Sequence, residues 1–145
     1  MLASFKRFIV KLILGALIVP IVLIVIFKFI NPPFWGWEIS RTIFPPQGYP
    51  KQTHHQWVNL NKISKNMQLA VIASEDQTFP EHHGIDLSAT LSVLEHSGKN
   101  GPSRGASTIT QQTAKNVFLF PSHSFIRKGI ELYFALWMEV IWGKD

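Results

Sequence analysis

The sequence predicts a mainly α-helical protein, in which a single N-terminal transmembrane helix precedes a compact helical domain. A long apolar run without charges opens the chain, and residues typical of helix N-caps recur ahead of apolar stretches in the remainder. Apolar residues make up 46% of the 145 residues, aromatic residues 12% and charged residues 16%. This composition excludes intrinsic disorder. Because the chain has no cysteine, a disulfide framework, a thiolate zinc site and a cysteine nucleophile are also excluded.

Residues 1–31 are predicted to form a cytoplasmic N-terminus and a transmembrane anchor. The stretch Leu12–Phe27 carries no charge, and extension to Phe8 and Ile30 gives a helix about 35 Å long, enough for a hydrocarbon core of about 30 Å. Pro20 is expected to kink this helix without breaking it. A cleaved signal peptide is the alternative, but aromatic residues and prolines follow the apolar run where a cleavage site needs small side chains.

The basic charge is concentrated at this end of the chain. Residues 1–31 hold four basic residues and no acid, so they supply +4 of the net charge of +5. Three of these bases precede the apolar run, which predicts an N-terminus in the cytoplasm and an outer location after about residue 32: Lys6, Arg7 and Lys11. Residues 32–145 supply only +1 and show no basic stripe before about residue 99, so no nucleic-acid partner is expected.

Residues 32–62 are rich in proline, glycine and aromatic side chains, and they are predicted to form an extended juxtamembrane stalk with one short strand at most. Residues 63–145 are predicted to form a helical domain. Ser64 caps its first helix, which runs from Lys65 to about Gln77. The predicted buried side of this helix holds most of its apolar residues: Met67, Leu69, Ala70, Val71, Ile72 and Ala73.

A second helix is expected to begin at a cap formed by Asp86 or Ser88 and to end near His96. The segment Ser97–Gly105 after it consists of turn-forming residues and is expected to be a mobile loop.

Two further helices complete the predicted domain. Thr108 and Gln111 fit a capping box that opens the third helix, which ends near Phe118. Ser124 caps the fourth, and Gly143 suits its C-terminal end. The fourth helix carries apolar residues at near-helical spacing: Ile126, Ile130, Phe134, Trp137 and Ile141.

The end of the first helix carries the first group of residues with catalytic potential. Glu75 lies beside Asp76, and partial burial there would raise the pKa of a carboxyl toward the range of a general base. The alternative is a solvated helix end with two ordinary acids. His82 and His83 with Asp86 suggest a metal site, but their spacing matches no zinc signature, and histidines packed in a turn are the preferred interpretation.

The start of the third helix is a candidate anion site. Gly105 permits close backbone approach, and the helix N-terminus after it presents free N–H groups, which together suit phosphate or pyrophosphate. Neutral donors and one cation add to these groups: Ser107, Thr108, Gln111, Gln112 and Lys115. The alternative is a capped helix after a surface loop. A Walker A loop is excluded, because it needs Gly-Lys-Ser/Thr in sequence.

The start of the fourth helix carries a cluster of charges. Arg127 and Lys128 lie about one turn before Glu131, a spacing typical of surface ion pairs that contribute about 0.2–0.5 kcal/mol each. The functional interpretation is a cationic cluster for phosphate with an acid held among the cations.

In this order, the three segments resemble the motifs of the peptidoglycan glycosyltransferases, a family of monofunctional biosynthetic transglycosylases and the transglycosylase domains of class A penicillin-binding proteins. The first motif, Glu-Asp-x-x-Phe-x-x-His-x-Gly-x-Asp, is matched by Glu75, Asp76, Phe79, His82, Gly84 and Asp86. The second, Gly-x-Ser-Thr-Ile-Thr-Gln-Gln-x-x-Lys-Asn, is matched by Gly105, Ser107–Gln112, Lys115 and Asn116. The third, Arg-Lys-x-x-Glu, is matched by Arg127, Lys128 and Glu131.

The resemblance implies the N-terminal portion of a lysozyme-like α-helical glycosyltransferase domain on the periplasmic face of the inner membrane. It implies polymerisation of lipid II into glycan strands, with inversion of configuration and release of undecaprenyl pyrophosphate. Glu75 is implied as the general base, and Glu131 as the second catalytic glutamate, near the sugar–pyrophosphate of the donor. The other matched residues are implied to bind substrate.

The resemblance implies no tightly bound cofactor, although a divalent cation, Mg²⁺ or Mn²⁺, would suit the pyrophosphate. The implied partners are lipid II, the growing glycan strand, the cytoplasmic membrane and other cell-wall synthesis proteins. The alternative function is a non-catalytic anchored module that binds a lipid-linked saccharide or such a partner, and a glycan-cleaving hydrolase is a more distant alternative.

Two features depart from the family pattern. The family usually has an arginine eight residues before the second glutamate, where this chain has His123. A neutral imidazole offers one hydrogen-bond donor in place of the fixed cationic fork of a guanidinium. Binding of the donor substrate is therefore expected to be weaker or more dependent on pH. The family's domain also continues beyond the equivalent of residues 143–145, so the resemblance covers about residues 55–145 and the chain is expected to be C-terminally truncated. Apolar side chains near this end are expected to be exposed: Trp137, Ile141 and Trp142.

Overall fold

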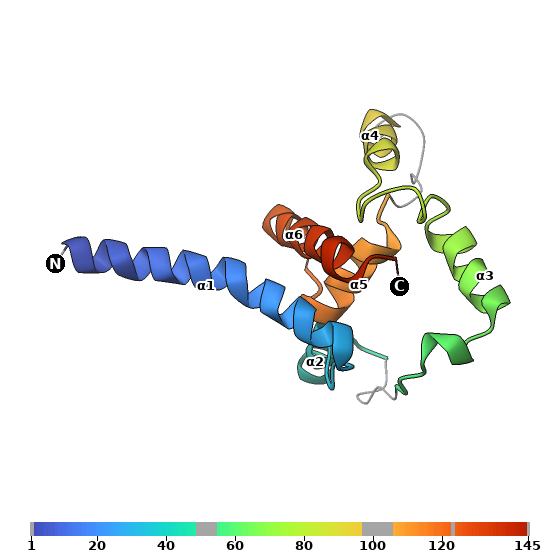
Figure 1. Cartoon of the computed structure of the whole chain (residues 1–145), viewed down its shortest axis with the longest axis horizontal. Coiled ribbons are helices and arrows are strands. Elements are labelled where there is room, and N and C mark those ends of the chain that lie inside the picture. The colour runs from blue at the N-terminus through green and yellow to red at the C-terminus, as the bar shows by residue number, and fades with distance from the viewer. Residues whose placement is uncertain (1, 49–54, 97–105, 123, 145) are drawn as a thin grey trace.

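The computed structural model describes residues 2–48, 55–96, 106–122 and 124–144, and these residues form helices joined by turns, with no strand among them. The helices are α1 (Leu2–Phe29), α2 (Gly36–Ile43), a 3₁₀ turn (Leu60–Lys62), α3 (Lys65–Glu75), α4 (Leu87–His96), α5 (Ile109–Phe118) and α6 (Phe125–Trp142). Figure 1 shows α1 as a long rod that leads into a cluster of α2, α5 and α6, while α3 stands apart. The predicted mainly α-helical fold is confirmed.

Helix α1 corresponds to the predicted membrane helix. Its stretch Ser4–Phe29 is long and apolar enough to cross a bilayer, and an 18-residue window within it has a mean hydropathy of 3.0. Pro20 lies inside α1, and the helix continues past it to Phe29, as expected. Composition and length therefore support a single membrane-spanning helix among the residues described.

The core lies where α5, α6 and the C-terminal half of α1 meet. Phe118 of α5 stacks on Phe27 of α1, with 5.6 Å between ring centroids, and on Phe134 of α6, at 4.7 Å. The buried apolar side chains are Ile24, Ala114, Phe134, Ala135 and Met138. Burial of these groups holds the three helices together. It is needed most by α5, because an isolated helix of 10 residues is marginal by propensity alone.

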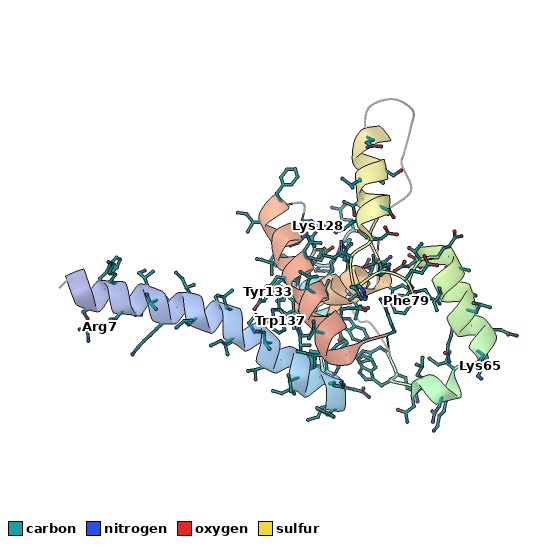
Figure 2. The ribbon with its side chains drawn as sticks, turned by 45° about the horizontal axis from the view of Figure 1, so that its top comes forward. Arg7, Lys65, Phe79, Lys128, Tyr133 and Trp137 are labelled. Carbon is teal, nitrogen blue, oxygen red and sulfur yellow. The ribbon has the colours of Figure 1, made fainter. Side chains whose placement is uncertain are left out.

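Helix α6 also bonds to the backbone of α1. The Tyr133 hydroxyl donates to the Leu17 carbonyl at 2.6 Å, and the Trp142 indole N–H donates to the Ile24 carbonyl at 2.8 Å. Figure 2 shows Tyr133 and Trp137 on the side of α6 toward α1. Three side chains near the end of α6 are half-buried against the core, so the expectation that they are exposed is wrong: Trp137, Ile141 and Trp142.

Helix α2 occupies part of the segment that composition predicts to be extended, so that prediction is wrong for Gly36–Ile43. The helix packs on α5. Its first residue approaches Leu119 so closely that a Cβ on Gly36 would lie 2.9 Å from the Leu119 carbonyl carbon. Trp35 packs edge to face on Trp57, with 5.7 Å between centroids. Tertiary packing therefore selects a helix where local composition favours an extended chain.

Helix α3 begins where predicted, and it ends at Glu75, two residues earlier than expected. Ser64 Oγ accepts from the Met67 N–H at 3.2 Å, which is the expected cap. The predicted buried side is wrong, because α3 has no buried residue. Its apolar side chains instead have large exposed fractions: Met67 59%, Leu69 65% and Val71 43%. An apolar face needs a packing partner, and no helix of the described residues packs extensively along α3 (Figure 1).

The remaining helices begin at the predicted residues. A backbone N–H of α4 donates to Asp86 Oδ1 at 2.8 Å, so Asp86 is the cap. Thr108 and Gln111 form the predicted capping box at the start of α5. Ser124 precedes α6, but its side chain makes no capping bond, so the predicted cap is wrong although the helix begins where expected. Gly143 ends α6 with a φ of 72°, a positive value that glycine adopts more readily than other residues.

Candidate active site

Glu75 is the last residue of α3, and its carboxylate meets α5. Gln112 Nε2 donates to Glu75 Oε2 at 2.9 Å, which joins the first motif to the second. Glu75 is exposed, so the expected partial burial is wrong. The reason is that α3 has no buried residue, so the described residues leave its C-terminal end open to solvent on the side of the cavity. An exposed carboxylate that is oriented by an amide is accessible to a substrate hydroxyl.

Asp76, next to Glu75, is buried and bound by two other parts of the site. His82 Nε2 lies 3.0 Å from its Oδ1 and 2.9 Å from its Oδ2. The Ile109 N–H donates to Asp76 Oδ2 at 2.9 Å. Ile109 is the first residue of α5, whose N–H has no partner within the helix, and a carboxylate there is favourable for the helix dipole. Asp76 therefore ties the residue after Glu75 to the N-terminus of α5.

Asp86 closes the turn between α3 and α4. Its carboxylate accepts from the Ala89 N–H at 2.8 Å, from Ser88 Oγ at 2.6 Å and from Thr78 Oγ1 at 2.6 Å. These three bonds, that of Ala89 most strongly, lower the pKa of Asp86 from 3.8 to about 2, against the opposing effect of burial. The nearby His82 adds a smaller lowering of this pKa. Asp86 is therefore ionised at neutral pH.

Thr108 connects the second motif to the first. Its hydroxyl donates to the Gly84 carbonyl at 2.6 Å and accepts from the Gln111 N–H at 3.1 Å. Gly84 has a φ of 79°, and a Cβ there would lie 3.0 Å from the Ala135 carbonyl oxygen of α6. Only glycine fits this conformation and this approach without strain. The turn that carries Gly84 is thus held between the start of α5 and the middle of α6.

Glu131 is 2% exposed, and both of its carboxylate oxygens face cations. Arg127 Nη1 lies 2.5 Å from Oε2, and Lys128 Nζ binds Oε1. Lys128 Nζ also lies 3.4 Å from Ser107 Oγ and from Gln111 Oε1. A solvated ion-pair face would leave the glutamate exposed, so the alternative of a plain surface cluster does not fit. The third motif meets the second through Lys128, which Figure 2 places near the start of α6.

A cavity of about 450 Å³ lies between the end of α3, α4 and the start of α5. Its lining combines the first two motifs with one side of α4 and includes Glu75, Asp76, Thr78, Asp86, Ala89, Ser92, Val93, Ser107, Thr108 and Gln112. Glu75 and the donors of the candidate anion site therefore face a common space. Lys128 reaches the edge of this space through Ser107.

The other predicted site residues are less closely engaged. Lys115 is half-buried on α5, and Asn116 is exposed. In the part of the chain that the structure describes, Lys115 forms no ion pair. Gly105 and His123 lie outside the described residues, as does the predicted mobile loop at 97–105.

Two residues outside the three motifs reach the turn of the first motif. Lys144 Nζ donates to the His82 carbonyl at 2.6 Å, pairs with Glu139 at 2.8 Å and lies 4.6 Å from the centroid of the Phe79 ring. Thr78, which bonds to Asp86, is a third residue that the motif pattern did not single out. No sequence signal marks Lys144 and Glu139, because only the docking of α6 brings them to this turn, whereas the bond of Thr78 lies within the turn itself.

The residues present do not fit a resident metal at Glu131. Within the described ranges, no group of three or more His, Cys, Asp or Glu side chains could hold a metal ion. The ring of His82 is packed in the turn and faces Asp76, which agrees with the preferred interpretation of that histidine. Both oxygens of Glu131 already pair with Arg127 and Lys128. A Mg²⁺ or Mn²⁺ ion that arrives with a pyrophosphate stays a prediction.

Comparison with known families bears directly on this arrangement of three joined motifs. The family model described as transglycosylase matches residues 42–145. The chain belongs to the transglycosylase family. The match begins within α2, so it reaches further toward the N-terminus than the motifs alone indicated.

Three curated relatives, each named biosynthetic peptidoglycan transglycosylase, show how much of a family member this chain represents. The protein of Vibrio parahaemolyticus is 58% identical over 145 residues, which is the whole of this chain and 64% of the relative. That of Shewanella oneidensis is 51% identical over 134 residues, 92% of this chain and 57% of the relative. That of Xylella fastidiosa is 36% identical over 141 residues, 96% of this chain and 58% of the relative.

The chain thus spans less than two thirds of the length of these relatives. No solved structure matches it, so the lysozyme-like architecture of the whole domain stays a prediction.

Proposed function

We propose that this chain carries the catalytic residues of a peptidoglycan glycosyltransferase, which polymerises lipid II into glycan strands and releases undecaprenyl pyrophosphate. The observation that carries the proposal is the meeting of three motifs at the first turns of α5. Glu75 bonds to Gln112, Asp76 to Ile109 and Lys128 to Gln111. The name that the relatives carry, biosynthetic peptidoglycan transglycosylase, supports the same class of reaction.

In this proposal Glu75 is the general base. Its carboxylate takes the proton from a hydroxyl of the acceptor sugar, and the freed oxygen attacks the anomeric carbon of the donor. The bond from that carbon to the pyrophosphate breaks, and the configuration inverts. Gln112 engages Oε2 of Glu75, which leaves Oε1 to accept the proton. A positioned general base contributes about 10²–10⁴-fold to the rate of such a step.

The cations of the third motif would stabilise the pyrophosphate as it leaves with negative charge. Lys128 lies next to donors at the edge of the cavity, and Arg127 lies one residue before it. We assign Glu131 to holding these two cations rather than to proton transfer, because it is buried and both of its oxygens are paired. Lys115 adds a further positive charge on α5.

The proposal includes a single-pass anchor, with the N-terminus in the cytoplasm and the active site on the periplasmic face of the inner membrane. Three basic residues before the apolar run support this orientation. Lipid II and the growing strand are both lipid-linked. Confinement of enzyme and substrates to one surface raises their effective concentration and limits their relative orientations.

The proposal is tested by polymerisation of lipid II by the full chain in bilayers, with Glu75→Gln compared with Glu95→Gln. Glu95 is an exposed acid of α4 that does not line the cavity. We expect Glu75→Gln to lower the rate by at least about 10²-fold while binding of lipid II is retained, because the amide cannot accept the proton. Glu95→Gln should match the wild-type rate.

Two outcomes would overturn this function. Retention of polymerisation by Glu75→Gln would remove Glu75 as the base. A wild-type chain that binds lipid II but never extends it would instead be the non-catalytic anchored module.

A further inference from the structure

The C-terminal end of α6 holds the turn of the first motif through one side chain. Gly143 ends the helix with a positive φ of 72°, and Lys144 follows it directly. The Lys144 ammonium donates to the His82 carbonyl at 2.6 Å and lies 4.6 Å from the centre of the Phe79 ring. Its charge is balanced by Glu139, 2.8 Å away. One cation thus contacts two positions of the turn and is itself fixed by α6.

The turn leads from Lys144 to the proposed base in a short series of contacts. The carbonyl of His82 binds Lys144, and the ring of the same residue faces the Asp76 carboxylate. Asp76 follows Glu75 directly and is bound to the N-terminus of α5 by Ile109. A shift of His82 would therefore move or release Asp76, and with it the end of α3 on which Glu75 lies.

The backbone of α6 approaches the same turn closely. A Cβ on Gly84 would lie 3.0 Å from the Ala135 carbonyl oxygen and 3.2 Å from Glu139 Cβ. Thr110 of α5 contacts the Glu139 carboxylate at 3.5 Å. Glu139 therefore lies where α5, α6 and the turn meet, and it orients Lys144 on the turn. Lys144 does not line the cavity that Glu75 faces.

We propose that Lys144, oriented by Glu139, is a positioning residue for the general base, which it serves through His82 and Asp76. The proposal rests on the proposed function. Since Lys144 lies outside the cavity, its loss should misplace the base without removing a substrate contact. The rate of the chemical step should then fall, while the apparent affinity for lipid II stays the same.

The test compares Lys144→Met with Lys62→Met in the full chain in bilayers. Methionine keeps most of the side-chain length and removes the charge and the donors. Lys62 is an exposed lysine of the 3₁₀ turn, far from the site in sequence. We expect Lys144→Met to lower kcat by about ten-fold or more, with KM within about two-fold of the wild-type value. Lys62→Met should leave both constants unchanged, and Lys144→Arg should restore most of kcat, because it keeps a cationic donor.

The route through His82 has its own test. In a His82→Gln background, Lys144→Met should lower kcat little further, because the two substitutions break the same series of contacts. In the isotope-labelled chain, the ¹⁵N shifts of the His82 imidazole should change on Lys144→Met and not on Lys62→Met. This spectrum needs no catalysis, so it separates the positioning role from the proposed function.

Several results would overturn the inference. One is a kcat for Lys144→Met equal to that of Lys62→Met, and another is an effect confined to KM. Full additivity with His82→Gln would exclude the route through that residue. If the wild-type chain does not polymerise lipid II, the proposed function fails, and an unchanged His82 spectrum in Lys144→Met would then refute the positioning role as well.

Discussion

At the residue scale, Asp86 makes the free energy of unfolding depend on pH, and the direction of this dependence follows from its hydrogen bonds. Three hydrogen bonds favour its ionised form and hold its pKa at about 2 in the folded chain, below the ordinary value of 3.8. A pKa that is lower in the folded state contributes stability above the unfolded pKa, and this stability is lost as the pH falls through the folded pKa. The difference corresponds to about 2 kcal/mol at neutral pH.

We therefore expect Asp86→Asn to lower the free energy of unfolding at pH 7 by about 2 kcal/mol. The penalty should shrink between about pH 4 and pH 2, because the wild-type carboxylate becomes protonated in that interval. Denaturant unfolding of the detergent-solubilised chain at a series of pH values measures this difference. A penalty that stays constant across the interval would mean that the bonds of Asp86 do not depend on its charge.

Gly84 gives a second prediction, with a matched control in α6. Gly84→Ala places a Cβ in a left-handed conformation and 3.0 Å from the Ala135 carbonyl oxygen, so we expect a loss of about 1–2 kcal/mol or more. Gly129→Ala lies inside α6 with nothing within 4 Å of the new Cβ, and it should stabilise the chain by up to about 1 kcal/mol. Thermal unfolding of both variants shows whether the first loses stability and the second gains it. Equal effects would contradict a packed turn at Gly84.

Single residues were predictable where a local rule governs them. The caps at Ser64, Asp86 and Thr108 follow from side chains that bond to the nearest free N–H groups, which lie within three residues. The pairing of Asp76 with His82 and the contact of Lys144 with the same turn were not predictable, because they depend on how distant elements dock. The burial expected at Glu75 failed for the same reason.

At the scale of elements, α3 shows what an apolar pattern can and cannot predict. The pattern correctly predicts a helix, but burial also needs a partner, and spacing does not say where that partner lies. Similarly, the proline-rich segment before it contains α2, because Gly36 lets that helix approach the backbone at Leu119. In both cases the tertiary neighbour, rather than the local sequence, decides the exposure of the element.

This view predicts unequal costs for two truncations of large apolar side chains. Leu69 of α3 is 65% exposed, so Leu69→Ala should lower the free energy of unfolding by no more than about 0.5 kcal/mol. Phe134 of α6 is 6% exposed and stacks on Phe118, so Phe134→Ala should cost about 3–5 kcal/mol. Denaturant titration of the two variants gives the comparison. A cost at Leu69 close to that at Phe134 would show that α3 is packed in solution.

At the scale of the whole molecule, α1 is the candidate membrane span and also contributes a side chain to the hydrophobic core. Its length and hydropathy were predictable from the sequence, because both depend only on the residues within the helix itself. Its contact with α6 was not, since an apolar helix surface suits lipid and protein equally. Ile24 is fully buried although most of α1 is exposed, so one side of the helix belongs to the folded part.

The last prediction concerns whether this contact persists in a bilayer. Because the chain has no cysteine, Leu17→Cys and Tyr133→Cys form a unique pair at a place where the Tyr133 hydroxyl is 2.6 Å from the Leu17 carbonyl. A short thiol-reactive linker should join this pair in vesicles. Val10→Cys with Tyr133→Cys is the control, because Val10 lies about 10 Å further along the helix. Leu17 is near the middle of Ser4–Phe29, so an efficient link would place Tyr133 within the depth of the bilayer beside α1. Linking in detergent alone would mean that α6 leaves α1 when lipid surrounds it.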